Sequence, residues 1–330
     1  MPQTIKLALL DDYQKVAMRL GDWDRLKKRG VEITAFHEPF SSIADAVAKL
    51  APFQMLQLLR ERTAFPRALI ERLPNLKFMV LTGARASSLD DKAATERGIP
   101  ISNTPGGGSN ASTAELCWAL LMSCARDLAK GERLMRTGGW HDGIKGMQVL
   151  EGKRLGILGL GRLGSRVAGY AKAFGMDVVA WSQNLTAEKA AAGGARLVSK
   201  DELLATSDFV TIHLVLSART RDLIGAADLA KMKKTAMLIN TSRGPIVNEE
   251  ALIAALRNGT IAHAGLDVYD KEPLPAGHAL TKLDNVTLVP HLGYVVEEAY
   301  RNFYEGTIAD IEAWLDGKPI NVINPEALKA

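Results

Sequence analysis

Cysteine and long apolar runs are both scarce in this sequence. The 330 residues include two cysteines, Cys117 and Cys124, which lie seven positions apart in an apolar helical stretch. That setting favours buried core thiols over a disulfide or a metal site, and it fits a reducing compartment. No segment approaches the roughly 20 apolar residues that a membrane-spanning helix needs. We therefore expect no membrane partner and no bound metal.

A marked excess of charge of one sign is also absent. Lys and Arg number 41 against 37 Asp and Glu, and the net charge of +4 is too small and too dispersed for a nucleic-acid-binding surface. The first apolar run stops at Asp11 and Asp12 without a cleavage site, so we predict no secretory signal and a cytoplasmic location. Apolar residues at 47% and charged residues at 24% are typical of globular proteins, and the length suits two domains at roughly 150 residues each.

Short apolar runs of β type alternate along the chain with helical patterns. We expect strands at residues 5–10, 53–59, 77–82, 154–158, 177–181, 208–213, 235–240, 261–266 and 286–289. Strands that alternate with helices predict parallel sheets joined by right-handed crossovers, which is an α/β architecture.

Two breaks in the patterning mark candidate hinges. The first, residues 103–110, contains a proline and three glycines, and the helix after it opens with a capping-box pattern of Ser112 and Glu115. These glycines alone could suggest a phosphate loop, but the Lys-Ser/Thr pair of a Walker loop is missing, which favours a hinge. The second break, residues 290–293, precedes the last helical pattern of the chain.

The strongest motif is a glycine-rich turn between a strand and a helix. Gly159, Gly161 and Gly164 follow the strand predicted at 154–158 and lead into a helical stretch at 165–174. Gly159 permits the tight turn, Gly161 lets the backbone approach a pyrophosphate, and Gly164 allows the helix to pack closely on the strand. Free N–H groups at the helix start would face the phosphates. Because strand and helix flank the glycines, the motif predicts a dinucleotide-binding site.

The end of the next strand bears on the choice of cofactor. A site that prefers NAD usually places an acidic residue there, about 20 residues after the glycines, to hold the ribose 2′-hydroxyl. Here Ser182, Gln183 and Asn184 follow the strand, and their side chains can donate hydrogen bonds to a 2′-phosphate. No arginine stands at these positions. The sequence therefore admits NAD or NADP, with a slight preference for NADP.

Three ionisable side chains, Arg243, Glu272 and His291, each follow a later β-type run. Singly, each is an ordinary solvated or structural residue, but ligands of open α/β sheets bind beyond the carboxyl ends of the strands, where these three could converge. Hydride transfer to a ketone leaves an alkoxide, and histidine, with a pKa of about 6.5, is a natural proton donor for it. Glu272 would favour the imidazolium and fix its tautomer, and Arg243 would offer a fork for a substrate carboxylate. The set favours an anionic 2-oxo acid.

These residues closely resemble the D-isomer-specific 2-hydroxyacid dehydrogenase family. The matching stretches are residues 159–164, 213–214, 220–225, 232–233, 239–244, 264–268, 272–273 and 290–293. The resemblance implies two doubly wound parallel-sheet domains, with a Rossmann dinucleotide-binding domain (105–294) inserted into a flavodoxin-like substrate domain (1–104 plus 295–330) and the active site in the cleft. It also implies a homodimer, for which the apolar helix predicted at 115–128 is a candidate contact, although its periodicity does not separate a subunit contact from core.

The same resemblance implies roles for single residues. His291 would be the catalytic acid/base, Glu272 its partner, and Arg243 the anchor that polarises the carbonyl. The residues that would bind the cofactor are Thr113, Gly159, Gly161, Arg162, Leu163, Gly164, Ser182, Gln183, Thr241 and Asp267, of which Asp267 would face the nicotinamide amide. The residues that would bind the substrate are Gly83, Ala84, Arg85 and Arg243.

Three positions depart from the family pattern. Arg85 lies in a loop where many members carry a small residue and a glycine, so it could add a second positive contact to the substrate. Val215 stands where a proline commonly follows His213 and Leu214, and it could alter the loop beside the cofactor. Ser182 replaces the usual acid.

We therefore predict an oxidoreductase that transfers hydride between NAD(P)H and a 2-oxo acid or D-2-hydroxy acid. The substrate would be similar to glyoxylate, hydroxypyruvate or phosphoglycerate, or bulkier. Two alternatives stay open. A dinucleotide-sensing corepressor resembles the same family and would change its assembly or partner binding on cofactor addition. Oxidation of formate or phosphonate on the same scaffold is the other alternative.

Overall fold

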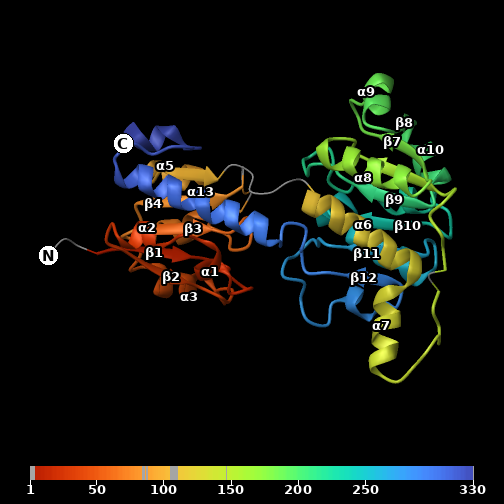
Figure 1. The fold of residues 1–330 in the computed structure, drawn as a ribbon, viewed down its shortest axis with the longest axis horizontal. Coiled ribbons are helices and arrows are strands. Elements are labelled where there is room, and N and C mark those ends of the chain that lie inside the picture. The colour runs from red at the N-terminus through yellow and green to blue at the C-terminus, as the bar shows by residue number, and fades with distance from the viewer. Residues whose placement is uncertain (1–3, 84–85, 87, 105–110, 146, 330) are drawn as a thin grey trace. The chain divides into compact units, whose positions relative to one another are not determined.

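The chain forms two compact units, each built on a parallel sheet. The computed structural model describes residues 4–83, 86, 88–104, 111–145 and 147–329. One unit comprises residues 110–295, and the other comprises residues 1–109 and 296–330 (Figure 1). The predicted divisions lie at 104/105 and 294/295. The predicted α/β class with two parallel-sheet domains is confirmed.

The unit that contains the N-terminus has a five-stranded parallel sheet of order β2-β1-β3-β4-β5, the flavodoxin-like order (Figure 1). Its strands are β1 (Ile5–Leu9), β2 (Val31–Ala35), β3 (Met55–Leu58), β4 (Phe78–Thr82) and β5 (Ile101–Thr104). Its α-helices are α1 (Ala17–Leu20), α2 (Asp24–Lys27), α3 (Ile43–Leu50), α4 (Arg67–Ile70), α5 (Asp91–Glu96) and α13 (Glu297–Leu315).

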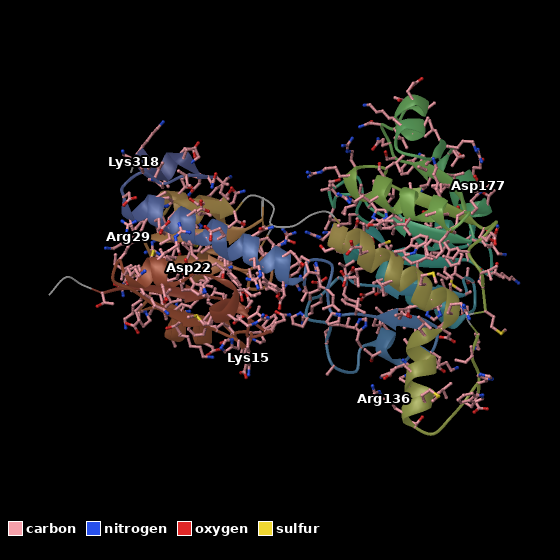
Figure 2. The ribbon with its side chains drawn as sticks, viewed as in Figure 1. Lys15, Asp22, Arg29, Arg136, Asp177 and Lys318 are labelled. Atoms are coloured by element: carbon pink, nitrogen blue, oxygen red, sulfur yellow. The ribbon has the colours of Figure 1, made fainter. Side chains whose placement is uncertain are left out.

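Helix α13 returns from the end of the chain to cover β4 and β5. Strands buried on both faces carry unbroken apolar runs, because successive side chains point to opposite sides of the sheet. Phe78 of β4 stacks on Trp314 of α13 with ring centroids 5.2 Å apart. Arg29, which is labelled in Figure 2, pairs with Asp316 at 2.5 Å just beyond α13. Packing and ion pairs thus hold the distant helix to the N-terminal sheet.

The inserted unit has a seven-stranded parallel sheet of order β12-β11-β10-β9-β6-β7-β8 (Figure 1). Its strands are β6 (Arg154–Leu158), β7 (Asp177–Trp181), β8 (Arg196–Leu197), β9 (Phe209–Ile212), β10 (Met237–Asn240), β11 (His263–Leu266) and β12 (Val286–Leu288). Its α-helices are α6 (Ala111–Arg126), α7 (Leu128–Arg136), α8 (Arg162–Ala173), α9 (Ala187–Ala192), α10 (Lys200–Thr206), α11 (Ala226–Leu229) and α12 (Glu249–Arg257).

Two apolar layers cover the two faces of this sheet. Helices α6 and α8 supply one layer, and α10 to α12 supply the other. Strand β6 lies between β7 and β9, so the chain winds outward from β6 in both directions. This reversal is the topological switch point at which α/β proteins bind ligands. Among the residues that the structure describes, no helix has the length and apolar character of a membrane span.

The sequence-based interpretation of α6 was wrong at both of its ends. The helix begins at Ala111, so Ser112 is a helical residue and does not cap it. It ends at Arg126, because Asp127 adopts a left-handed φ of 53° and α7 begins afterwards, so the predicted single helix to residue 128 is broken. The prediction of core thiols is confirmed, since Cys117 and Cys124 are free and buried, and burial raises the pKa of both to about 12.

Candidate active site

The glycine turn between β6 and α8 combines two tight packing positions with one open position. Gly159 has a φ of +98°, and a Cβ there would lie 2.8 Å from the carbonyl oxygen of His213. A Cβ on Gly164 would lie 2.2 Å from the carbonyl oxygen of Gly159. Gly161 is exposed, and nothing lies within 4 Å of where its Cβ would be. Two glycines therefore serve the fold of the turn, and the third leaves space in front of the helix.

The start of α8 fits the phosphates of a dinucleotide. Gly161 caps the helix with no side-chain hydrogen bond, and Arg162 and Leu163 are its first two residues. N–H groups in the first turn of a helix have no partner within the helix, and together with the helix dipole they attract anions. A pyrophosphate can approach these donors across Gly161 because no side chain fills that space.

Ser182 and Gln183 directly follow β7, which is the strand next to β6. Ser182 is half-buried and Gln183 is exposed. Neither residue carries a negative charge, so no carboxylate from these two positions faces a ribose held beside the glycine turn.

Glu272 and His291 form a direct hydrogen-bonded pair. Nδ1 of His291 lies 2.6 Å from Oε2 of Glu272, and the two side chains are 14% and 22% exposed. Tyr294 packs edge-on against the imidazole, with ring centroids 5.8 Å apart. Because the carboxylate occupies Nδ1, any proton given to a ligand would come from Nε2.

Asp267 fixes the backbone that carries this imidazole. Its buried carboxylate accepts hydrogen bonds from the N–H groups of Leu292 at 2.5 Å and Gly293 at 3.1 Å. Thr113 of α6 donates its hydroxyl proton to the carbonyl oxygen of Gly293 at 2.8 Å. Both residues were expected to contact the cofactor, and here they hold the turn that follows His291.

Arg243 lies in a turn at the end of β10 that Asn240 organises. The side chain of Asn240 donates to the carbonyl oxygen of Arg243 at 3.0 Å and accepts from the N–H of Ser242 at 3.0 Å. The hydroxyl of Ser242 donates to the carbonyl oxygen of Ile212 at the end of β9. Thr241 is 6% exposed within the same turn. The backbone that carries the guanidinium is therefore fixed on two strands, and Nη1 of Arg243 donates to the carbonyl oxygen of Ser242 at 2.7 Å.

Adjacent strands bring these groups to one edge of the sheet. Strands β10, β11 and β12 are neighbours and parallel, so Arg243, Glu272 and His291 all follow the carboxyl ends of consecutive strands. The structure joins Glu272 to His291 by a hydrogen bond. Arg243 follows β10, which is the strand next to β11. Gly83, which follows β4, belongs to the other unit, and Ala84 and Arg85 lie outside the described residues.

A second histidine at this edge, His213 after β9, has a different character. Its Nε2 lies 4.0 Å from the Sγ of Cys117, and its buried Nδ1 has no hydrogen-bond partner in the described part of the chain. Burial lowers the pKa of His213 to about 4, so its imidazole is neutral at physiological pH. Of the two imidazoles, that of His291 has the carboxylate partner that a proton donor needs.

Sequence reasoning missed two aromatic residues at this edge. Tyr294 follows the histidine turn, and Tyr269 lies between Asp267 and Glu272. The sequence patterns assign neither residue a role. Neither local pattern contains the long-range contacts that bring them to the charged groups.

Comparisons with known proteins agree with this geometry. Residues 118–293 match the family described as D-isomer specific 2-hydroxyacid dehydrogenase, NAD binding domain. A glyoxylate reductase of Aeropyrum pernix is 40% identical over 269 residues, which cover 79% of this chain and 80% of that protein. A hydroxypyruvate reductase of Blautia hydrogenotrophica is 29% identical over 330 residues, which cover 97% of this chain and 100% of that protein.

Solved structures show the same likeness. A phosphoglycerate oxidoreductase from Vibrio cholerae superposes with a TM-score of 0.89 at 32% identity, covering 95% of this chain and 99% of that one. The family match spans more than half of the chain and includes the glycine turn, Arg243, Glu272 and His291. The chain therefore belongs to the D-isomer-specific 2-hydroxyacid dehydrogenase family.

Proposed function

We propose that this chain reduces a short, anionic 2-oxo acid to the D-2-hydroxy acid, with His291 as proton donor, Glu272 as its partner and Arg243 as substrate anchor. Family membership makes it an NAD(P)-dependent oxidoreductase acting on 2-oxo acids. The observation that carries the assignment of roles is the 2.6 Å contact between His291 and Glu272 at the carboxyl edge of the sheet. The names of the two reductases compared above support a small substrate.

The side chains account for the movement of charge. A reduced nicotinamide dinucleotide, held at the glycine turn between β6 and α8, would supply the hydride. Nε2 of His291 gives its proton to the carbonyl oxygen as that oxygen gains negative charge. Glu272 accepts the Nδ1–H and stabilises the imidazolium before transfer. Arg243 binds the substrate carboxylate and draws electron density from the carbonyl.

A substrate panel tests the proposal. The purified chain is mixed with NADH or NADPH and with glyoxylate, hydroxypyruvate, pyruvate and a bulkier 2-oxo acid, and cofactor oxidation is followed at 340 nm. We expect turnover with at least one of the small acids. Cofactor binding without turnover on any of them would contradict the proposal, and a change of assembly on NADH addition would then favour the sensing alternative.

We propose a preference for NADPH, because the residues after β7 supply hydrogen-bond donors and no carboxylate. Replacing Ser182 by Asp is expected to weaken NADPH binding by about tenfold or more, since the new charge would repel the 2′-phosphate. NADH binding should change by less than threefold, because that cofactor offers a 2′-hydroxyl to the carboxylate. Fluorescence titration with both cofactors measures the effect. Equal weakening for NADH and NADPH would show that Ser182 does not face this group.

We also propose that the chain acts as a homodimer through an arm formed by residues 128–145 and 147–149. Helix α7 opens this arm and projects from the sheet with no buried residue, and Arg136 lies toward its far end (Figure 2). Trp140 and Met147 in the arm are 65% and 79% exposed, beside a hollow of about 580 Å³. Large exposed apolar side chains of this kind are typical of protein contacts.

We also propose that the protein is located in the cytoplasm.

Charge placed on the arm should separate the subunits. The double replacement of Trp140 and Met147 by Asp is expected to yield monomers at micromolar concentration in sedimentation velocity, because each introduced carboxylate would be buried without a partner. Val215, which is 83% exposed outside the arm, provides the matched control. Val215→Asp should leave the sedimentation coefficient at the wild-type value. A wild-type chain that sediments as a monomer would contradict the proposal directly.

A further inference from the structure

Tyr269 touches the charged groups of the site from a position just behind them. It lies in the segment after β11 and is 7% exposed. Its N–H donates a hydrogen bond to Oε1 of Glu272 at 3.1 Å, while Oε2 of the same carboxylate lies 2.6 Å from Nδ1 of His291. One oxygen of Glu272 is therefore fixed to Tyr269 and the other faces the imidazole.

The hydroxyl of Tyr269 reaches the strand that leads to the imidazole. It lies 2.9 Å from the carbonyl oxygen of Val289 and 3.1 Å from that of Leu266, and its single proton can be donated to one of them at a time. The same Val289 carbonyl accepts the N–H of His291 at 3.0 Å. Tyr269 and His291 thus share one acceptor, which ties the phenol to the backbone of the proton donor.

The main chain of Tyr269 also supports the turn that carries the guanidinium. A Cβ added to Gly244 would lie 2.1 Å from the carbonyl carbon of Tyr269 and 2.3 Å from its oxygen. The residue after Arg243 therefore packs on the backbone of Tyr269 at a distance that only glycine allows. Three segments of the site meet at this one tyrosine.

We propose that Tyr269 is a positioning residue that keeps Arg243, Glu272 and His291 in register for proton and hydride transfer. The inference rests on the proposed function and deepens it. Tyr269 acts through its neighbours and does not act on the substrate. Misplacement of a reacting group by 1 Å can cost about a hundredfold in rate, so a residue that fixes relative positions affects kcat more than binding.

Tyr269→Phe removes the hydroxyl and keeps the ring. We expect kcat to fall about three- to tenfold, the effect of one lost hydrogen bond, with KM for the 2-oxo acid and Kd for NADPH within twofold of wild type. Without the phenol, the Val289 carbonyl that accepts the N–H of His291 is held less firmly, so the imidazole should lie less well on Glu272. The imidazolium should then be less stable, and the basic limb of the kcat–pH profile should move to lower pH. Asp267, which holds the backbone of Leu292 and Gly293, and Tyr294, which packs on the imidazole, are unchanged in the variant.

Tyr300→Phe provides the matched control. Tyr300 is 2% exposed, and its hydroxyl donates to Oε1 of Gln14 at 2.7 Å, both residues belonging to the unit that contains the N-terminus. Both variants lose the hydrogen bond of one buried phenol, so both should show a small loss of Tm, and only Tyr269→Phe should change kcat and the pH profile. A Tyr269→Phe enzyme with wild-type kcat and pH profile, whatever its Tm, would overturn the proposal.

A second readout separates this inference from the proposed reaction. Titration of the imidazole of His291 by NMR, with its signal identified by its loss in His291→Gln, needs no substrate. We expect the pKa of this imidazole to be lower in Tyr269→Phe than in the wild-type chain and equal in Tyr300→Phe. An unchanged pKa in Tyr269→Phe would overturn the positioning role, whereas a wild-type chain inactive on every 2-oxo acid would overturn the proposed function alone.

Discussion

Replacing His291 by Ala is expected to reduce kcat for 2-oxo acid reduction by about 10²–10⁴-fold, the usual contribution of a positioned proton donor. The imidazole is 14% exposed and its Nδ1 is engaged by Glu272, so water does not readily supply the same proton from the same position. Steady-state kinetics at saturating NADPH and substrate measure the loss. The Kd for NADPH should stay within about threefold of wild type, because the glycine turn is untouched.

A second histidine–carboxylate pair in the same unit serves as control. His278 lies 3.2 Å from Glu249, and their side chains are 20% and 21% exposed, so the burial of this pair resembles that of His291 and Glu272. His278→Ala removes a histidine–carboxylate contact of similar burial whose histidine has no assigned role in the site, and it should leave kcat within twofold of wild type. If His291→Ala retained a nearly normal rate, this histidine would have no place in proton transfer.

Two glycines of the nucleotide turn should respond in opposite ways to a methyl group. In Gly164→Ala the new Cβ would meet the carbonyl oxygen of Gly159 at 2.2 Å, so the backbone must shift, and we expect the free energy of unfolding to fall by about 3 kcal/mol. In Gly161→Ala the Cβ would meet nothing within 4 Å, so stability should be unchanged or slightly higher. The same methyl would stand where a pyrophosphate approaches the helix, and NADPH affinity should fall by about tenfold or more.

Thermal unfolding and NADPH titration of both variants complete this test. The expected pattern is a large fall of Tm for Gly164→Ala and a large rise of Kd with a normal Tm for Gly161→Ala. A Gly161→Ala chain that binds NADPH as tightly as the wild type would show that the phosphates do not lie against Gly161. The assigned cofactor position would then be wrong.

The sequence predicted the α/β class and nine strands because strands buried on both faces need continuous apolar runs. Three strands lack that signal. Strand β2 buries mainly Val31, and β8 has two residues. Strand β5 includes Ser102 and Thr104, both 0% exposed, whose hydroxyls bond the carbonyl oxygen of Ile320 and the N–H of Gly83. Because the groups that satisfy these two hydroxyls are distant in the sequence, no local apolar pattern marks β5 as a strand.

The candidate site was predictable to a similar extent. Parallel neighbouring strands place their carboxyl ends together, which is why three scattered residues could be assigned to one edge. The position of Tyr269 depends on hydrogen bonds to Glu272 and Val289 and on the close approach of Gly244, which no spacing rule contains. The left-handed Asp127 that separates α6 from α7 was missed because the apolar pattern continues through it.

The return of α13 to the N-terminal sheet has a consequence for synthesis on the ribosome. Phe78 is made long before Trp314, the side chain that covers it, and the whole inserted unit is translated in the interval. The side of β4 and β5 on which α13 packs therefore stays uncovered until α13 emerges, whereas the inserted unit can complete its own core first. Chaperones that shield apolar surface should engage nascent chains whose N-terminal sheet still lacks this helix.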